Sequence, residues 1–244
     1  MNALIRSELT KLTTTRTPRW VLVVQVVVLA LAISGAIASG AMPDAKLATG
    51  DGLRAVLEHG GLVAILSLTV GITLSAGEFR HGTVVDTFLT EPRRGRVLLS
   101  KFAAGGIAGL VAGIVVATAT VGITIAWFAT KDIDLGWTTA WRSFAGIVLW
   151  QALYTVIGVA LGAVVRAQAA AVVGAVIWLY VVETAVSQLL SSVGRWLPAT
   201  AARALGYSSE PGLLPQVGGG ATLAAWAVAA GIAAVVLTQR RDLT

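Results

Sequence analysis

The sequence predicts an all-α polytopic membrane protein, with six transmembrane helices in one domain that covers residues 1–244. Six apolar stretches are each about long enough to cross a hydrocarbon layer of ~30 Å as a helix. They lie at about 20–39, 60–77, 102–129, 144–165, 168–190 and 221–238. None alternates as a barrel strand does, and only helices satisfy every backbone group of such sequence in lipid. Because 56% of the residues are hydrophobic and 12% charged, no separate soluble domain is expected.

Lysine and arginine divide unequally between alternate loops, and this division predicts the topology. Twelve of the 18 lie in the N-terminal segment, in the loop from Glu78 to Lys101, at Arg166 or at the C-terminus, and six lie in the other loops. Both termini and the 78–101 loop are therefore expected to be cytoplasmic. A cleaved export signal ending near Ala36–Ala38 is the competing interpretation, but the apolar stretch is too long and the basic leader too extended for one.

Several classes of function are disfavoured by what the sequence lacks. The chain has no cysteine, which excludes disulfides, thiolate metal ligands and a cysteine nucleophile. His59 and His81 fall on opposite sides of the membrane and no HExxH occurs, so neither a metal site nor an intramembrane protease is expected. No phosphate-binding loop of the GxxxxGK[ST] type is present, so ATP hydrolysis by this chain is not expected. The basic residues lie beside helix ends, where anionic lipids account for them, and nucleic acid is not an expected partner.

Residues 2–16, before the first span, predict a helix that lies in the cytoplasmic interface. Ile5, Leu9 and Leu12 form one apolar stripe, and Glu8 precedes Lys11 by three residues. The turn into the membrane is expected at Thr17-Pro18. The alternative is a frayed basic leader that only fixes topology.

The loop between the second and third spans predicts a short amphipathic helix over residues 83–90. Thr83 and Asp86 have the spacing of a capping box, and Glu91-Pro92 ends the run. The apolar face consists of Val84, Val85, Phe88 and Leu89. A partner protein could accept this face. The alternative is a helix that lies flat on lipid, followed by a basic cluster at 93–96 that is only a topology signal.

The same loop resembles that of the permease subunits of ABC-2 type transporters, the membrane subunits of bacterial ABC exporters. The matching positions are Glu78, Arg80, Gly82, Thr83, Pro92, Arg93, Arg96 and Lys101, and the leader with Glu8, Lys11 and Arg16 also resembles the start of that family. The likeness in topology covers the whole chain, whereas the motifs are confined to these two segments.

This resemblance implies a function and a set of partners. The short helix would be a coupling helix that docks on a separate ATPase through Thr83, Val84, Val85, Asp86, Phe88 and Leu89. Two ATPase subunits would carry ATP and magnesium, and this chain would hold no cofactor and would not itself be an enzyme. A second copy of the chain, or a related permease, would complete a multi-pass exporter of a hydrophobic or amphipathic substrate in the bacterial plasma membrane.

Small residues inside the spans predict close helix contacts. Gly105, Gly109 and Gly113 repeat every four residues in the third span, and Gly158 and Gly162 do so in the fourth. Glycine is abundant, so chance spacing is the alternative, and the pattern does not identify the neighbouring helix.

Glu183 is the only acidic residue of the sequence that lies inside one of the six apolar stretches. Such a carboxylate is normally paired or turned toward a wet cavity. A role in a transport pathway, with Gln188 close by, and a structural role in which the carboxylate reaches outward to Arg195 or Arg203 are both open.

Residues 191–220 predict an external helical lid between the fifth and sixth spans. Pro198 and Gly206 have the positions expected at the start and the stop of a short helix. The family resemblance implies short external helices at this place. The alternative is a loop that rests on the lipid headgroups with Trp196 and Tyr207 as aromatic anchors.

Two other functions remain open. An ion-coupled secondary transporter would show an inverted repeat or several intramembrane acids, and neither is evident. A non-transporting membrane scaffold or sensor would share the topology and could use the amphipathic loop to bind a soluble protein.

Overall fold

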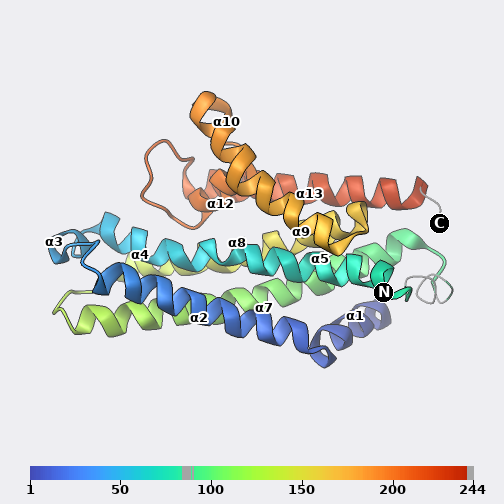
Figure 1. Ribbon diagram of the computed structural model, residues 1–244, viewed down its shortest axis with the longest axis horizontal. Helices are drawn as coiled ribbons and strands as arrows, with labels where there is room; N and C mark the ends of the chain where they lie inside the picture. Colours follow the sequence, from blue (N-terminus) through green and yellow to red (C-terminus); the bar gives the residue numbers. More distant parts are fainter. Residues whose placement is uncertain (84–88, 90, 241–244) are drawn as a thin grey trace.

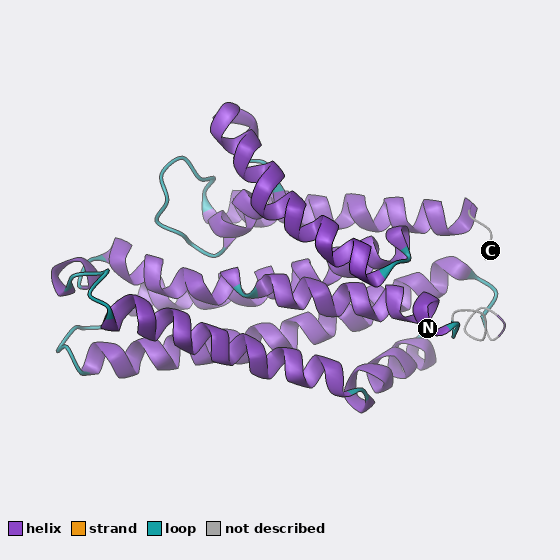
Figure 2. Ribbon diagram, in the orientation of Figure 1, coloured by secondary structure: helices purple, strands orange, loops and turns teal. Residues whose placement is uncertain are grey.

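The computed structural model describes residues 1–83, 89 and 91–240. The structure is 84% helical and has no strand among the described residues, as Figure 2 shows. Within those residues, six helices are long and apolar enough to cross a membrane, which confirms the predicted all-α polytopic class. They are Arg16–Ala38, Gly50–Arg80, Arg94–Ala129, Trp137–Val165, Gln168–Leu189 and Gln216–Arg240.

Short helices extend or connect these spans, and the helices lie largely along one axis (Figure 1). One end of the molecule, here called the α1 end, carries α1, the end of α5, the start of α7 and the end of α13. The opposite end, here called the α3 end, carries α3. The elements are α1 (Asn2–Thr14), α2 (Arg16–Ala38), α3 (Asp44–Leu47), α4 (Gly50–Leu62), α5 (Ala64–His81), α7 (Arg94–Ala129), α8 (Trp137–Val165), α9 (Gln168–Ile177), the π-helical turn η1 (Trp178–Val182), α10 (Glu183–Leu189), α11 (Ser191–Gly194), α12 (Pro198–Leu205) and α13 (Gln216–Arg240).

Helix α8 packs most extensively against α5 and α7, and glycines make these contacts close. A Cβ atom at Gly158 would lie 2.1 Å from the Leu68 carbonyl oxygen of α5, and one at Gly162 would lie 2.5 Å from that of Ile72. On the side of α7, a Cβ atom at Gly109 would lie 2.7 Å from the Cα atom of Ala152. The repeated glycines therefore mark close helix packing, as predicted. The sequence pattern could not identify the neighbours, which are α5 for the glycines of α8 and α8 for those of α7.

Most of the spans are longer than their apolar stretches, and the second and third exceed them by the most. Helix α7 begins at Arg94 instead of 102, and its 36 residues correspond to ~54 Å at the usual helical rise. Val97 and Leu98 are buried, so this basic first part is held by packing that hydropathy alone does not detect. The second span likewise extends back through α4 to Gly50, with a break at Val63.

A buried polar cluster compensates for that break. Gln25 on α2 donates from Nε2 to the Val63 carbonyl (3.1 Å) and to Gln151 Oε1 on α8 (3.1 Å). Gln151 in turn donates to the Gly60 carbonyl (3.3 Å), and the Ser67 hydroxyl donates to Gln151 Oε1 (2.5 Å). Carbonyls near a helix break need other donors inside a membrane. The two intramembrane glutamines supply them and thereby join α2, α8 and the α4–α5 junction.

Candidate functional site

An ionic cluster of two lysines and two glutamates lies at the α1 end. Lys101 of α7 places its Nζ atom 2.8 Å from Glu8 Oε2 and 2.6 Å from Glu78 Oε1, and it also donates to the Leu74 carbonyl (3.3 Å). Lys11 bridges the same carboxylates, at 2.7 Å to Glu8 and 2.6 Å to Glu78. The cluster therefore joins α1, the end of α5 and the beginning of α7.

Three of the four side chains are removed from solvent. The side chains of Glu8, Lys101 and Glu78 are 3%, 5% and 11% exposed, whereas that of Lys11 is 44% exposed. Burial lowers the pKa of Lys11, but hydrogen bonds and charge from Glu78 and Glu8 outweigh burial and raise this pKa above its usual 10.5. Two cations and two anions balance, and breaking one buried pair would leave an uncompensated charge.

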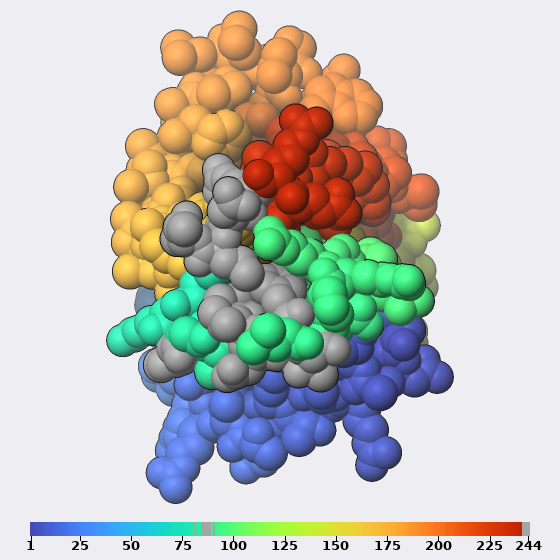
Figure 3. All heavy atoms as spheres, turned by 90° about the vertical axis from the view of Figure 1, so that its right-hand side faces the viewer, coloured from blue at the N-terminus to red at the C-terminus, as the bar shows by residue number. Residues whose placement is uncertain are grey.

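The structure brings together residues from both segments that carry the family resemblance. Glu78 and Lys101 come from the loop motif, and Glu8 and Lys11 from the leader. Figure 3 shows the N-terminal residues, the start of α7 and the end of α13 gathered on this face. The sequence indicated these four positions in two separate segments. They come together because α1 packs against α7.

The other loop residues stand at the surface of the α1 end. Gly82 ends α5 with a φ of +70°, a conformation that favours glycine. Arg80, Pro92 and Arg93 are exposed, and Arg96 lies 3.8 Å from Glu91. Leu89 is 76% exposed. The predicted contacts of Val84, Val85, Asp86 and Phe88, and thus the capping box of Thr83, lie outside the described residues.

A second candidate site surrounds Glu183. The π-helical turn Trp178–Val182 comes directly before this residue and changes the helical register at that point. Glu183 is only 1% exposed, although Val181 and Ala185 on the same helix are exposed. Its Oε2 atom accepts a hydrogen bond of 2.7 Å from the Ala199 backbone N–H, in the first turn of α12. The sequence WLYVV contains neither proline nor glycine, so nothing in it signals the turn.

The structure gives Glu183 a backbone amide as its partner, and neither of the two arginines considered for the structural role. Arg203 donates from Nε to Glu58 Oε1 (2.7 Å) and pairs with Glu210 as well. Burial lowers the pKa of Arg203, but Glu58 and Glu210 outweigh burial and raise it. Arg195 lies over the Trp196 ring, 5.6 Å from its centroid. The two arginines are thus engaged elsewhere. The chain between α10 and α12 instead brings the start of α12 to the Glu183 carboxylate.

Helix α12 runs over Pro198–Leu205 with Gly206 as its C-cap, which confirms the predicted start and stop. The chain after it is fixed to the bundle by polar contacts. Tyr207 has a φ of +65°, and its hydroxyl accepts hydrogen bonds from Arg54 (3.1 Å) and Arg142 (3.0 Å). Ser208 donates to Glu58 Oε2 (2.7 Å). Tyr207 therefore links the chain after α12 to α4 and α8, and its alternative role as a headgroup anchor stays a prediction.

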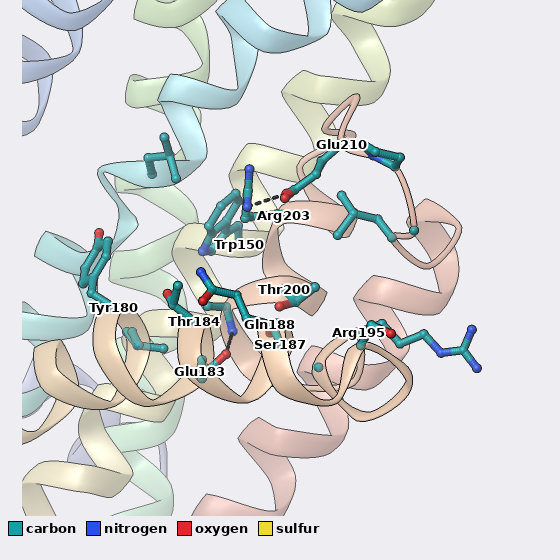
Figure 4. Close-up of a pocket in the computed structure, with 18 of the residues that line it drawn as sticks. Trp150, Tyr180, Glu183, Thr184, Ser187, Gln188, Arg195, Thr200, Arg203 and Glu210 are labelled. Atoms are coloured by element: carbon teal, nitrogen blue, oxygen red, sulfur yellow. Dashed lines mark hydrogen bonds and ion pairs between the residues drawn. The ribbon is translucent and has the colours of Figure 1, made fainter.

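A cavity of ≈ 440 Å³ lies between α10 with the π-helical turn before it, α8, and residues 191–213, here called the α12 segment (Figure 4). Aromatic residues Trp150, Tyr154 and Tyr180 line it together with aliphatic and hydroxyl side chains. Its polar lining comprises Glu183, Thr184, Ser187, Gln188, Arg195, Thr200, Arg203 and Glu210. Three predicted residues, Gln188, Arg195 and Arg203, thus share one cavity wall with Glu183.

Neither candidate site has the donor set of a metal centre: among the residues that the structure describes, no three histidines or carboxylates gather closely enough to hold an ion. Comparison of the chain with protein-family models and with curated proteins gave no match.

Proposed function

We propose that this chain is the membrane-spanning permease subunit of an ATP-driven transporter of the ABC-2 type. The ATPase would be a separate subunit, present in two copies and carrying ATP and magnesium. A second copy of this chain or a related permease would complete the translocation unit in the bacterial plasma membrane. The exported compound would be hydrophobic or amphipathic. In this arrangement the α1 end faces the cytoplasm and α1 lies in the membrane interface.

The ionic cluster is the observation that carries this proposal. Its residues lie on the two helices that lead into and out of the 82–93 segment, and on α1. A force applied to that segment would reach α5 and α7 together, because buried ion pairs resist separation. The close glycine contacts of both helices with α8 would pass the displacement along the bundle, since packed helices transmit strain. A coupling element needs this rigid support.

Features of the α3 end support the same function. The α12 segment closes over a cavity beside the fifth span and is fastened by Tyr207 and by the Glu58–Arg203 pair. These contacts are polar and separable, so the segment suits a lid over the outer end of a pathway. ATP binding in the partner would favour one arrangement of the permease pair and hydrolysis would release it.

Co-purification tests the proposal. The tagged chain, isolated from its own cells in mild detergent, should retain a Mg²⁺-dependent ATPase. Leu89→Asp should abolish this association without loss of a monodisperse profile, since Leu89 is 76% exposed and a charge there disturbs no packed core. Leu189→Asp is the matched control, because this leucine is 81% exposed at the end of α10, and the variant should keep the ATPase.

Retained ATPase binding in the Leu89→Asp variant, or no ATPase with the wild-type chain, would contradict the proposal. Uptake or release driven by an ion gradient in ATP-free vesicles would then identify a secondary transporter. Absence of any transport would favour the scaffold or sensor.

A further inference from the structure

We propose that the cavity beside Glu183 is a binding site for an amphipathic organic cation. The Glu183 carboxylate would pair with the cationic group, and the aromatic and aliphatic wall would hold the apolar body. The inference deepens the proposed function by naming the substrate class, and it rests on that function only for the step from binding to transport.

The two oxygens of the Glu183 carboxylate differ in their hydrogen bonds. One oxygen is held by the Ala199 amide at 2.7 Å, while Oε1 is buried and makes no hydrogen bond to any residue in the described ranges. The Trp178 indole and the Thr200 backbone are near the same carboxylate. A carboxylate inside a membrane is normally paired or turned toward a wet cavity. Here one buried oxygen lacks a hydrogen-bond partner on a residue that lines a cavity.

The other charges of the cavity wall are already neutralised or turned aside. Arg203 is engaged by both Glu58 and Glu210, so it offers no free positive charge to a ligand. Arg195 stacks over Trp196, and Figure 4 shows its guanidinium directed away from the cavity. Of the two carboxylates that line the cavity in the described part of the chain, Glu210 is paired with Arg203 and Glu183 has no cationic partner. A cationic ligand would supply it, whereas an anionic ligand would meet no free cation.

The remainder of the wall suits an apolar, partly aromatic body. Trp150 and Tyr154 of α8 form an edge-to-face pair with centroids 5.9 Å apart, and Tyr180 of the π-helical turn also lines the cavity. Aromatic faces attract organic cations as well as apolar groups. Leu62, Ile65, Leu179 and Leu213 complete the wall. The volume of ≈ 440 Å³ lies in the range of about 300–1,000 Å³ that small-molecule sites occupy.

The π-helical turn explains why such a site exists on a membrane-facing helix. Five residues in this register, Trp178–Val182, shift the side chains after them relative to a regular α-helix. Val181 remains 61% exposed while Glu183, two residues later, is buried in the cavity wall. Turns of this kind are frequent at functional sites. The irregular register is thus the local feature that brings a carboxylate from the fifth span into contact with the α12 segment.

Equilibrium binding to the purified chain in lipid nanodiscs, without ATP or any ATPase, tests the inference. The probe is radiolabelled tetraphenylphosphonium, and tetraphenylborate is the anion of the same shape. The cation should bind saturably and the anion should not compete for that site. Glu183→Gln should weaken cation binding by about tenfold or more, because the amide can still accept from Ala199 but carries no charge.

Two further variants keep the test decisive. Asp44→Asn removes a carboxylate that lies outside the cavity, is 63% exposed and is paired with Lys131, so this variant should bind the cation as wild type does. Ser187→Cys adds a thiol to the cavity wall of a chain that has no cysteine, and the cation should slow its labelling. This protection uses the native Glu183 and remains informative if Glu183→Gln does not fold.

Equal binding of anion and cation, unchanged binding in Glu183→Gln, or unprotected Ser187→Cys would each overturn the inference. Failure of the cation-binding proposal can be distinguished from failure of the proposed permease function, because cation binding and ATPase co-purification are measured separately. If the ATPase co-purifies but the cation does not bind, the permease remains and this site is removed. If the cation binds but no ATPase is found, the site remains and the permease is removed.

Discussion

Lys101 is a cation with a side chain only 5% exposed, and it touches two carboxylates and a backbone carbonyl. Such a residue contributes less through net attraction than through the cost of removing it, because Glu8 and Glu78 would remain buried without their partner. The sequence marked Lys101 and Glu78 as family-like positions. Their roles became apparent only from the fold, because the two residues are 23 positions apart and α1 supplies the remaining pair.

Replacement of Lys101 by methionine should lower the free energy of unfolding by about 3–5 kcal/mol, since the change leaves two buried carboxylates with only Lys11. The matched control is Lys131→Met. Lys131 also makes a short ion pair, 2.5 Å to Asp44, but that carboxylate is 63% exposed, and the expected loss is about 0–1 kcal/mol. Thermal and denaturant unfolding in detergent measure both. Equal losses would mean that the cluster has no special role.

At the scale of helices, the sequence predicted what hydrophobicity determines and missed what packing determines. Six spans and the bounds of α12 followed from apolar length and from Pro198 and Gly206. The break at Val63 and the π-helical turn before Glu183 did not: the first is stabilised by Gln25, which is distant in the chain, and the second occurs in WLYVV, which contains neither proline nor glycine. The partner of Glu183 was missed as well.

Glycine substitutions test the packing of α8. A Cβ atom at Gly158 would lie 2.1 Å from a backbone oxygen of α5, so Gly158→Ala must push two helices apart and should cost about 1–3 kcal/mol or more. A Cβ atom at Gly174 on α9 would meet no other atom within 4 Å, so Gly174→Ala should be neutral or slightly stabilising through helix propensity. Unfolding of the two variants under one set of conditions gives the comparison. A neutral Gly158→Ala would argue against a fixed α5–α8 contact.

At the scale of the whole molecule, the distribution of charge and the fold agree. The basic N-terminal segment, the basic residues at 93–96 and the last residues of α13 gather at the α1 end. Asp51, in the first turn of α4, and Asp132, which follows α7, lie toward the α3 end. A protein with this asymmetry should insert in one direction, because basic residues are retained on the cytoplasmic side. The coupling role and the lid role both require that orientation.

Single cysteines can report the orientation, since the chain has none of its own. Asp51→Cys and Asp132→Cys replace exposed residues at the α3 end, and Arg93→Cys replaces an exposed residue at the α1 end. A membrane-impermeant maleimide added to intact cells should label the first two, and should label the third only after the cells are opened. Labelling of Arg93→Cys in intact cells would place the 82–93 segment outside, where no ATPase could reach it, and would remove the proposed coupling together with the topology.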